Sequence, residues 1–163
     1  MLRTASRRIA LAAAALAFTA IAPSASAASA TPATAASLPV LVRVTVVDTT
    51  HTVFNGIVLT NGHDVTTATG GTHRCDGTNG GANPGRVATP TAALDDAARR
   101  AHFSWDGTWY PSFDDYAVSR IAADTAGASE YWNISVNGTP TPVGGCQFRI
   151  RTGDKVVFTL TAF

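Results

Sequence analysis

The chain has 163 residues, of which 45% are hydrophobic and 14% charged, and its formal net charge is +1. This length suits one domain of ordinary size, and the apolar content excludes an intrinsically disordered chain. The near-neutral charge argues against a nucleic-acid-binding protein, which normally carries a basic face. The composition is that of a small soluble globular domain and does not by itself name a ligand or an activity.

Residues 1–27 have the three parts of a secretory signal peptide. An apolar run over residues 9–22, shorter than a typical membrane-spanning helix of about 20 residues, precedes the small-residue cleavage site Ala25-Ser26-Ala27, with Ala28-Ser29-Ala30 as a second choice. The positive region before it contains Arg3, Arg7 and Arg8. Because residues 6–11 partly resemble a twin-arginine signal, the sequence leaves the export route open. We expect a secreted, extracellular protein.

Cleavage removes three of the 12 basic residues and none of the 11 acidic ones, which leaves a net charge of −2. A mildly acidic chain has no electrostatic reason to bind nucleic acid or, after signal cleavage, an anionic membrane. Residues 28–37 are small and polar, which indicates a flexible lead-in. A single domain is expected over residues 38–163.

Cys75 and Cys146 are the two cysteines of the chain. Export favours a disulfide between them, and closing so long a loop would stabilise the fold by about 4 kcal/mol. The alternative is a zinc site that combines both cysteines with His73 and with His63 or His102. Since the sequence lacks C-x-x-C and H-x-x-x-H spacings, we predict the disulfide and no metal.

The apolar pattern predicts mostly strands. Residues 40–47 are expected to bury Val42, Val44 and Val46 and to turn Arg43 and Thr45 outward. Residues 52–60 continue the β character, with a bulge or turn expected at Asn55-Gly56 and an end at Asn61-Gly62. Further strands are predicted over residues 116–121 and 131–136, before the turn Asn137-Gly138, and in a closing hairpin of residues 147–150 and 156–160. Residues 68–90 are predicted to be irregular and held by Cys75.

One helix is predicted over residues 91–102, with Thr89 or Thr91 as its N-cap. Its apolar stripe suggests close approach to a sheet and comprises Ala93, Leu94, Ala97, Ala98 and Ala101. Asp95–Arg99 and Asp96–Arg100 are expected to pair on a solvated face. The predicted fold class is α+β, with one helix packed on a mostly antiparallel or mixed sheet.

Eight of the thirteen aromatic residues lie in residues 103–132. Phe103, Phe113, Tyr116 and Trp132 are expected in the core. Trp105, Trp109 and Tyr110 flank turn residues, and we regard them as a candidate ligand-binding patch, because exposed aromatic rings stack on sugars, peptides and planar ligands.

The sequence lacks a recognisable catalytic set. It has no G-x-S-x-G motif, and adjacent strand residues such as Asp114 and Asp115 point to opposite faces. Short acidic segments at Asp76–Asn79 and Asp106–Thr108 lack the ligand count of a calcium loop and are interpreted as turns. We expect no enzyme activity and no cofactor. The alternative is an extracellular hydrolase using carboxylates among Asp106, Asp114, Asp115 and Asp124.

The C-terminal half resembles the transcobalamin C-terminal-like domain. The resemblance rests on the helix with Leu94 and Asp95, on residues 132–138 (WNISVNG) and on residues 153–158 (GDKVVF). It implies a β-grasp-like fold. Segments 70–79 and 142–147 also look like those of small secreted microbial proteins without assigned activity, a likeness that implies the Cys75–Cys146 bond.

In transcobalamin-like carriers this domain caps a corrinoid against a separate helical domain, which the present chain is too short to contain, so cobalamin binding is not expected. Function is predicted as a secreted, non-catalytic binding domain for a small molecule, glycan or protein. Besides the hydrolase, a cell-surface structural or inhibitory protein remains an alternative.

Overall fold

The computed structural model describes residues 37–163. The signal peptide predicted over residues 1–27, and all but the last residue of the lead-in, lie outside the described residues. The elements in chain order are β1 (Val40–Val47), β2 (Thr52–Thr60), β3 (His63–Thr67), β4 (Gly71–Cys75), a 3-10 turn (Asn79–Gly81), α1 (Pro90–Ala101), β5 (Trp105–Tyr110), β6 (Asp115–Ile121), β7 (Asp124–Thr125), β8 (Glu130–Val136), β9 (Thr139–Pro140) and β10 (Lys155–Ala162).

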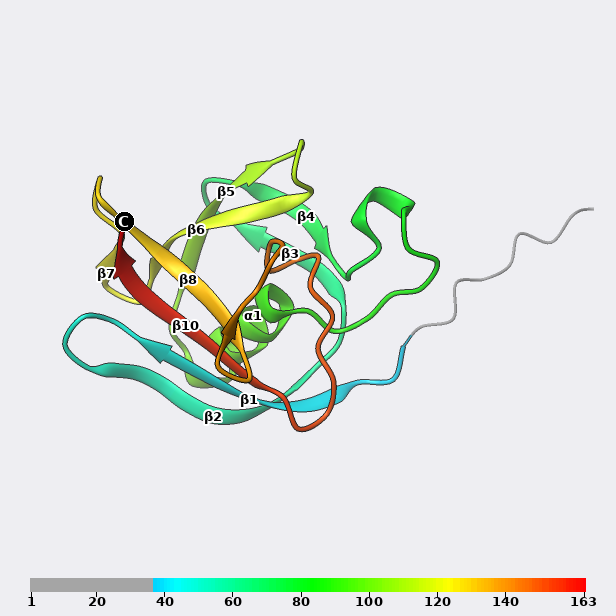
Figure 1. Ribbon diagram of the computed structural model, residues 1–163, viewed down its shortest axis with the longest axis horizontal. Coiled ribbons are helices and arrows are strands. Elements are labelled where there is room, and N and C mark those ends of the chain that lie inside the picture. Colours follow the sequence, from blue (N-terminus) through cyan, green and yellow to red (C-terminus); the bar gives the residue numbers. More distant parts are fainter. Residues whose placement is uncertain (1–36) are drawn as a thin grey trace, which may run out of the picture. The chain divides into compact units, whose positions relative to one another are not determined.

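The largest sheet has five strands in the order β2-β1-β10-β8-β9. Strands β1 and β10, near the two ends of the domain, lie side by side and pair in parallel, as Figure 1 shows. The other three pairings are antiparallel. The fold is therefore mostly β with one helix and a mixed sheet, which confirms the predicted class.

The inner face of this sheet forms the core with α1. Val42, Val44 and Val46 alternate with outward residues along β1, as predicted. They are joined by Val156 and Phe158 of β10, both fully buried. Four residues of the predicted apolar stripe of α1 are buried with them, whereas Ala101, at the last helical position, is exposed. Small alanine side chains let the helix backbone approach the sheet.

Both ends of α1 are fixed by local chemistry. Thr89 is the N-cap: its Oγ1 accepts from the Ala92 N–H at 3.3 Å and donates to the Cys75 carbonyl at 3.1 Å. At the other end His102 has a φ of 58°, and its N–H donates to the Ala98 carbonyl, a left-handed C-cap. The threonine thus ties the start of the helix to the residue that carries the disulfide.

Two smaller sheets complete the core. Strands β3 and β4 form a hairpin, and β5, β6 and β7 form a three-stranded sheet. The Tyr116 hydroxyl joins them, because it lies 2.9 Å from the Val65 carbonyl and 2.7 Å from the Gly71 carbonyl. Strands β3, β4 and β5 were not predicted, and residues 68–90 are not wholly irregular, since β4 lies within them.

The predicted disulfide between Cys75 and Cys146 is present and buried. Both backbone groups of Cys146 are also used: its carbonyl accepts from the Gly77 N–H at 3.0 Å, and its N–H donates to Asp115 Oδ1 at 2.9 Å. The preceding carbonyl, of Gly145, accepts from the Thr91 N–H in the first turn of α1. The disulfide therefore lies where β4, β6 and the start of α1 meet one loop.

Two details of the strand prediction were wrong. Residues 147–150 do not form a strand: the Gln147 and Phe148 N–H groups donate to the Gly144 carbonyl in a turn, and Ile150 bonds to Ala88. Strand β10 instead pairs with β1 and β8. Asn55-Gly56 is neither bulge nor turn, because β2 pairs continuously there and its irregularity lies opposite Val46 and Val47.

We expect reduction of the disulfide to lower the free energy of unfolding by about 4 kcal/mol, because the bond closes a loop of 71 residues in the unfolded chain. The check is chemical unfolding of the protein with and without reductant, with the Cys75→Ala, Cys146→Ala double variant as the reductant-insensitive control. Equal unfolding midpoints in oxidised and reduced protein would contradict this role.

Candidate functional site

An open hollow of about 450 Å³ lies between the β5–β6 hairpin and the loop that carries Cys146. This volume is within the range of small-molecule sites. The lining residues are Tyr110, Phe113, Asp115, Tyr116, Ala117, Pro142, Val143, Gly144 and Gln147. Most are apolar, and only Asp115 carries a charge, so the hollow is an apolar surface with one acidic group.

The first wall is the turn between β5 and β6. Asp114, at its end, has a φ of 49°, a left-handed conformation that aspartate tolerates better than most residues. The turn presents Tyr110 and Phe113, whose ring centroids are 6.5 Å apart. Tyr110 is 46% exposed and Phe113 68% exposed. The expectation that Phe113 belongs to the core was wrong, because the turn carries it outward.

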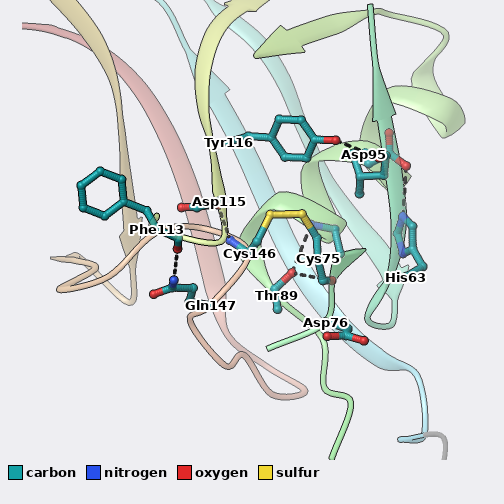
Figure 2. Close-up of a disulfide and its surroundings, with 12 residues drawn as sticks. His63, Cys75, Asp76, Thr89, Asp95, Phe113, Asp115, Tyr116, Cys146 and Gln147 are labelled. Atoms are coloured by element: carbon teal, nitrogen blue, oxygen red, sulfur yellow. Dashed lines mark hydrogen bonds and ion pairs between the residues drawn. A yellow bond between two sulfur atoms is a disulfide. The ribbon is translucent and has the colours of Figure 1, made fainter. Parts of the chain in front are cut away.

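The second wall is the loop of residues 142–147. A Cβ on Gly144 would overlap the Asp115 carboxylate, and one on Gly145 would overlap Thr91, so both glycines are needed for the close approach. Gln147 Nε2 donates to the Phe113 carbonyl and joins this wall to the first (Figure 2). Val143, 45% exposed, adds apolar surface.

Asp115 lies at the base of the hollow and is 7% exposed. Burial is the strongest influence on this carboxyl and raises its pKa to about 6. The charge of Asp114 acts in the same direction, whereas hydrogen bonds from backbone N–H groups, that of Cys146 among them, oppose it. Figure 2 shows the Asp115 carboxyl group between Cys146 and Phe113.

The three aromatic residues predicted as a binding patch have different environments. Trp105 is buried, and its Nε1–H donates to Asp95 Oδ1 at 3.2 Å. Trp109 is half-buried, with one ring face stacked on His73 at a centroid distance of 4.1 Å. Only Tyr110 lines the apolar hollow. The proline next to Tyr110 and the short turn were the sequence signals that could have indicated exposure of Phe113.

The carboxylates of the hydrolase alternative do not converge. Asp114 lines a second, polar hollow of about 320 Å³ with Trp109 and His73, whereas Asp115 lines the apolar one. The two carboxylates separate because Asp114 is the last, left-handed residue of the turn, whereas Asp115 begins β6. Asp106 accepts hydrogen bonds from the N–H and the hydroxyl of Thr69.

Asp95 is not on a solvated face, contrary to prediction. It is buried and pairs with Arg99 and with the indole of Trp105. It also lies 3.0 Å from His63 Nε2, a contact drawn in Figure 2. Burial alone would raise the pKa of Asp95, but these hydrogen bonds and the charge of Arg99 lower it. Asp96 pairs with Arg99 rather than Arg100, which donates to the Ile57 carbonyl.

The pKa of His63 is also changed by its contact with Asp95. Burial alone would lower its pKa, but the hydrogen bond to Asp95, the Asn61 carbonyl and the nearby acidic charges raise the pKa of His63 above 6.5. The imidazole bridges β3 to α1. This cluster holds elements together, and neither His63 nor Asp95 lines the apolar or the polar hollow.

Within residues 37–163, Asp48, His51 and Asp124 form the one group of three His, Cys, Asp or Glu side chains whose ligand atoms lie within 4.8 Å of one another. Such donors suit a divalent cation. However, Asp48 Oδ1 accepts from the N–H groups of Thr50 and His51, and Oδ2 lies 2.7 Å from His51 Nδ1. The contacts therefore account for the turn between β1 and β2 without an ion.

The chain is similar, over residues 112–162, to a family described as a domain of unknown function (DUF4430). The matched region begins just before Phe113 and contains both walls of the hollow except Tyr110. It covers less than half of the chain. No curated protein matches the sequence.

Two solved structures are similar to the chain at 13% identity. A crystal structure of haptocorrin in complex with Cbi covers 77% of this chain at a TM-score of 0.49, and the chain spans 25% of the haptocorrin chain. The second structure is a protein from Ruminococcus gnavus described as a putative metal binding protein, with a TM-score of 0.45. The similarity covers 76% of the present chain and 98% of the Ruminococcus gnavus chain.

We expect Asp115→Asn to change how stability depends on pH. Because the folded pKa of about 6 lies above the ordinary 3.8, the native state holds this proton more tightly, and stability is lost as pH rises from about 4 through about 6. The variant lacks this loss, which is at most about 3 kcal/mol. Unfolding measured across this range in both proteins is the check, and parallel curves would refute the assignment.

His63→Gln should act in a higher pH window. A raised histidine pKa stabilises the folded protein below 6.5, and that contribution disappears as pH rises through the folded pKa. Wild type should therefore lose stability from about pH 6.5 upward relative to the glutamine variant. The comparison uses thermal unfolding of both proteins across this range, and a stability difference that does not change with pH would contradict the assignment.

Proposed function

We propose that this protein is a secreted, non-catalytic binding domain whose ligand is a small molecule held in the apolar hollow. The observation that carries the proposal is the combination of two exposed aromatic rings and a buried carboxyl around one concave surface. A scattered exposed side chain needs no explanation, but apolar surface gathered in a hollow is typical of ligand sites.

The rigidity of the walls supports the same function. Gln147 and Cys146 each bond across the hollow to the hairpin, and the disulfide fixes the loop that contains them. A site held before the ligand arrives loses less conformational entropy on binding. The transcobalamin C-terminal-like identity of the domain is part of this proposal and is supported by the sequence motifs described above.

Secretion is proposed from the N-terminal signal pattern and fits the presence of a disulfide. In the part of the chain that the structure describes, we find no helix long and apolar enough to cross a membrane. Intact-mass measurement of protein collected from its native source tests this step, since cleavage after Ala27 and loss of two hydrogens are both visible in the mass.

The binding site is tested by Phe113→Ala, which removes an exposed ring at little cost in stability. We expect small aromatic probes, 2-phenylethanol among them, to shift backbone NMR signals of residues 110–117 and 142–147 in wild type and to bind at least about threefold more weakly to the variant. Tyr131→Ala is the matched control, because Tyr131 is also exposed but stacks on Phe163, outside the hollow. Equal weakening by both variants, or no shifts at the hollow, would contradict the proposal.

A further inference from the structure

Four aspartates of the described residues are buried: Asp48, Asp76, Asp95 and Asp115. Three of them lie beside a basic side chain. Asp48 Oδ2 is 2.7 Å from His51 Nδ1, Asp76 Oδ2 is 3.2 Å from Arg86 Nε, and Asp95 pairs with Arg99. Within residues 37–163, Asp115 has no ion pair with any Lys, Arg or His. The fold therefore supplies a cationic or imidazole partner for every buried aspartate except the one in the hollow.

Among the described residues, the carboxyl group of Asp115 is hydrogen-bonded by backbone N–H groups alone. Oδ1 accepts from the Cys146 N–H, and hydrogen bonds from the backbone N–H groups of Tyr116 and Gly145 also favour the ionised form, but no side chain among the described residues donates to either oxygen. Backbone donors reduce the cost of burying an ionised carboxylate, but they leave its negative charge without a compensating positive charge. A ligand that brings a positive charge to the base of the hollow would supply that compensation.

The walls favour the same charge. In the described part of the chain no basic residue lines the hollow, and Asp114, adjacent to Asp115 in sequence, adds negative charge. Tyr110 and Phe113 offer aromatic rings at its mouth, and aromatic faces attract ammonium groups more strongly than neutral groups. Pro142 and Val143 provide apolar contact for the rest of a ligand.

Resting on the proposed binding function, we infer that the ligand is a small organic cation: an ammonium group on an aromatic or aliphatic body. The ammonium group donates a hydrogen bond to Asp115, and the body lies between Tyr110, Phe113 and Val143. An anionic ligand of the same shape is excluded by repulsion from Asp115.

The test compares three probes with one body and different charge: 2-phenylethylamine, 2-phenylethanol and 3-phenylpropionate. Each is titrated at about pH 7.5, where Asp115 is ionised, into the oxidised full domain by calorimetry and by NMR shift mapping. We expect the amine to bind about tenfold or more tightly than the alcohol, and the carboxylate most weakly. In Asp115→Asn, which keeps an acceptor for the Cys146 N–H, the preference for the amine should disappear.

Each outcome separates the inference from the function on which it rests. Equal affinity for the amine and the alcohol, or tightest binding of the carboxylate, overturns the cation assignment and leaves a binding site. Absence of shifts in residues 110–117 and 142–147 with all three probes overturns the proposed function itself. If Asp115→Asn fails to fold, the ranking of the probes on wild type still decides the charge, and Phe113→Ala should weaken all three.

Discussion

Cys146 is the residue on which the architecture depends. Its sulfur is bonded to Cys75, its carbonyl accepts from Gly77, and its N–H donates to Asp115. One residue thereby joins the end of β4, the start of β6 and a loop that would otherwise have little to order it. Loops rich in glycine lose much conformational entropy on folding, so a covalent constraint in this place stabilises more than local contacts would.

The same constraint determines where a ligand is held. The hollow is formed by two segments about 30 residues apart in sequence, neither of which makes a concave surface alone. Alternation along β5 separates Trp109, which lines the polar hollow, from Tyr110, which lines the apolar one. The left-handed turn residue Asp114 likewise lines the polar hollow, whereas Asp115, the first residue of β6, lines the apolar one. Binding chemistry therefore depends on the register of a short hairpin and on the loop fixed opposite to it.

Elements with strong apolar periodicity could be predicted from sequence. Strands β1 and β2 begin and end as expected, and α1 differs by one residue, because valine alternation and the threonine N-cap are local signals. Strands β3 and β4 bury one valine, one threonine and one cysteine, and the Thr67 hydroxyl donates to the distant Gly107 carbonyl. No local pattern reveals such a partner. Residues 147–150 have a β-like sequence but do not form a strand, because hydrogen bonds to the Gly144 carbonyl fold the start of this segment into a turn.

The site was harder to predict than the fold because burial of an acid depends on distant residues. Asp114 and Asp115 are adjacent residues of the same type, but only Asp115 is buried. The absence of a side chain at Gly144 lets the loop close over Asp115. Asp95 was likewise expected in solvent and is buried. Yet Arg99, one helical turn later, pairs with Asp95, and no basic residue within residues 37–163 pairs with Asp115. An acid buried without an internal cation weakens the free protein, and a partner of opposite charge from outside is the simplest physical reason for that arrangement.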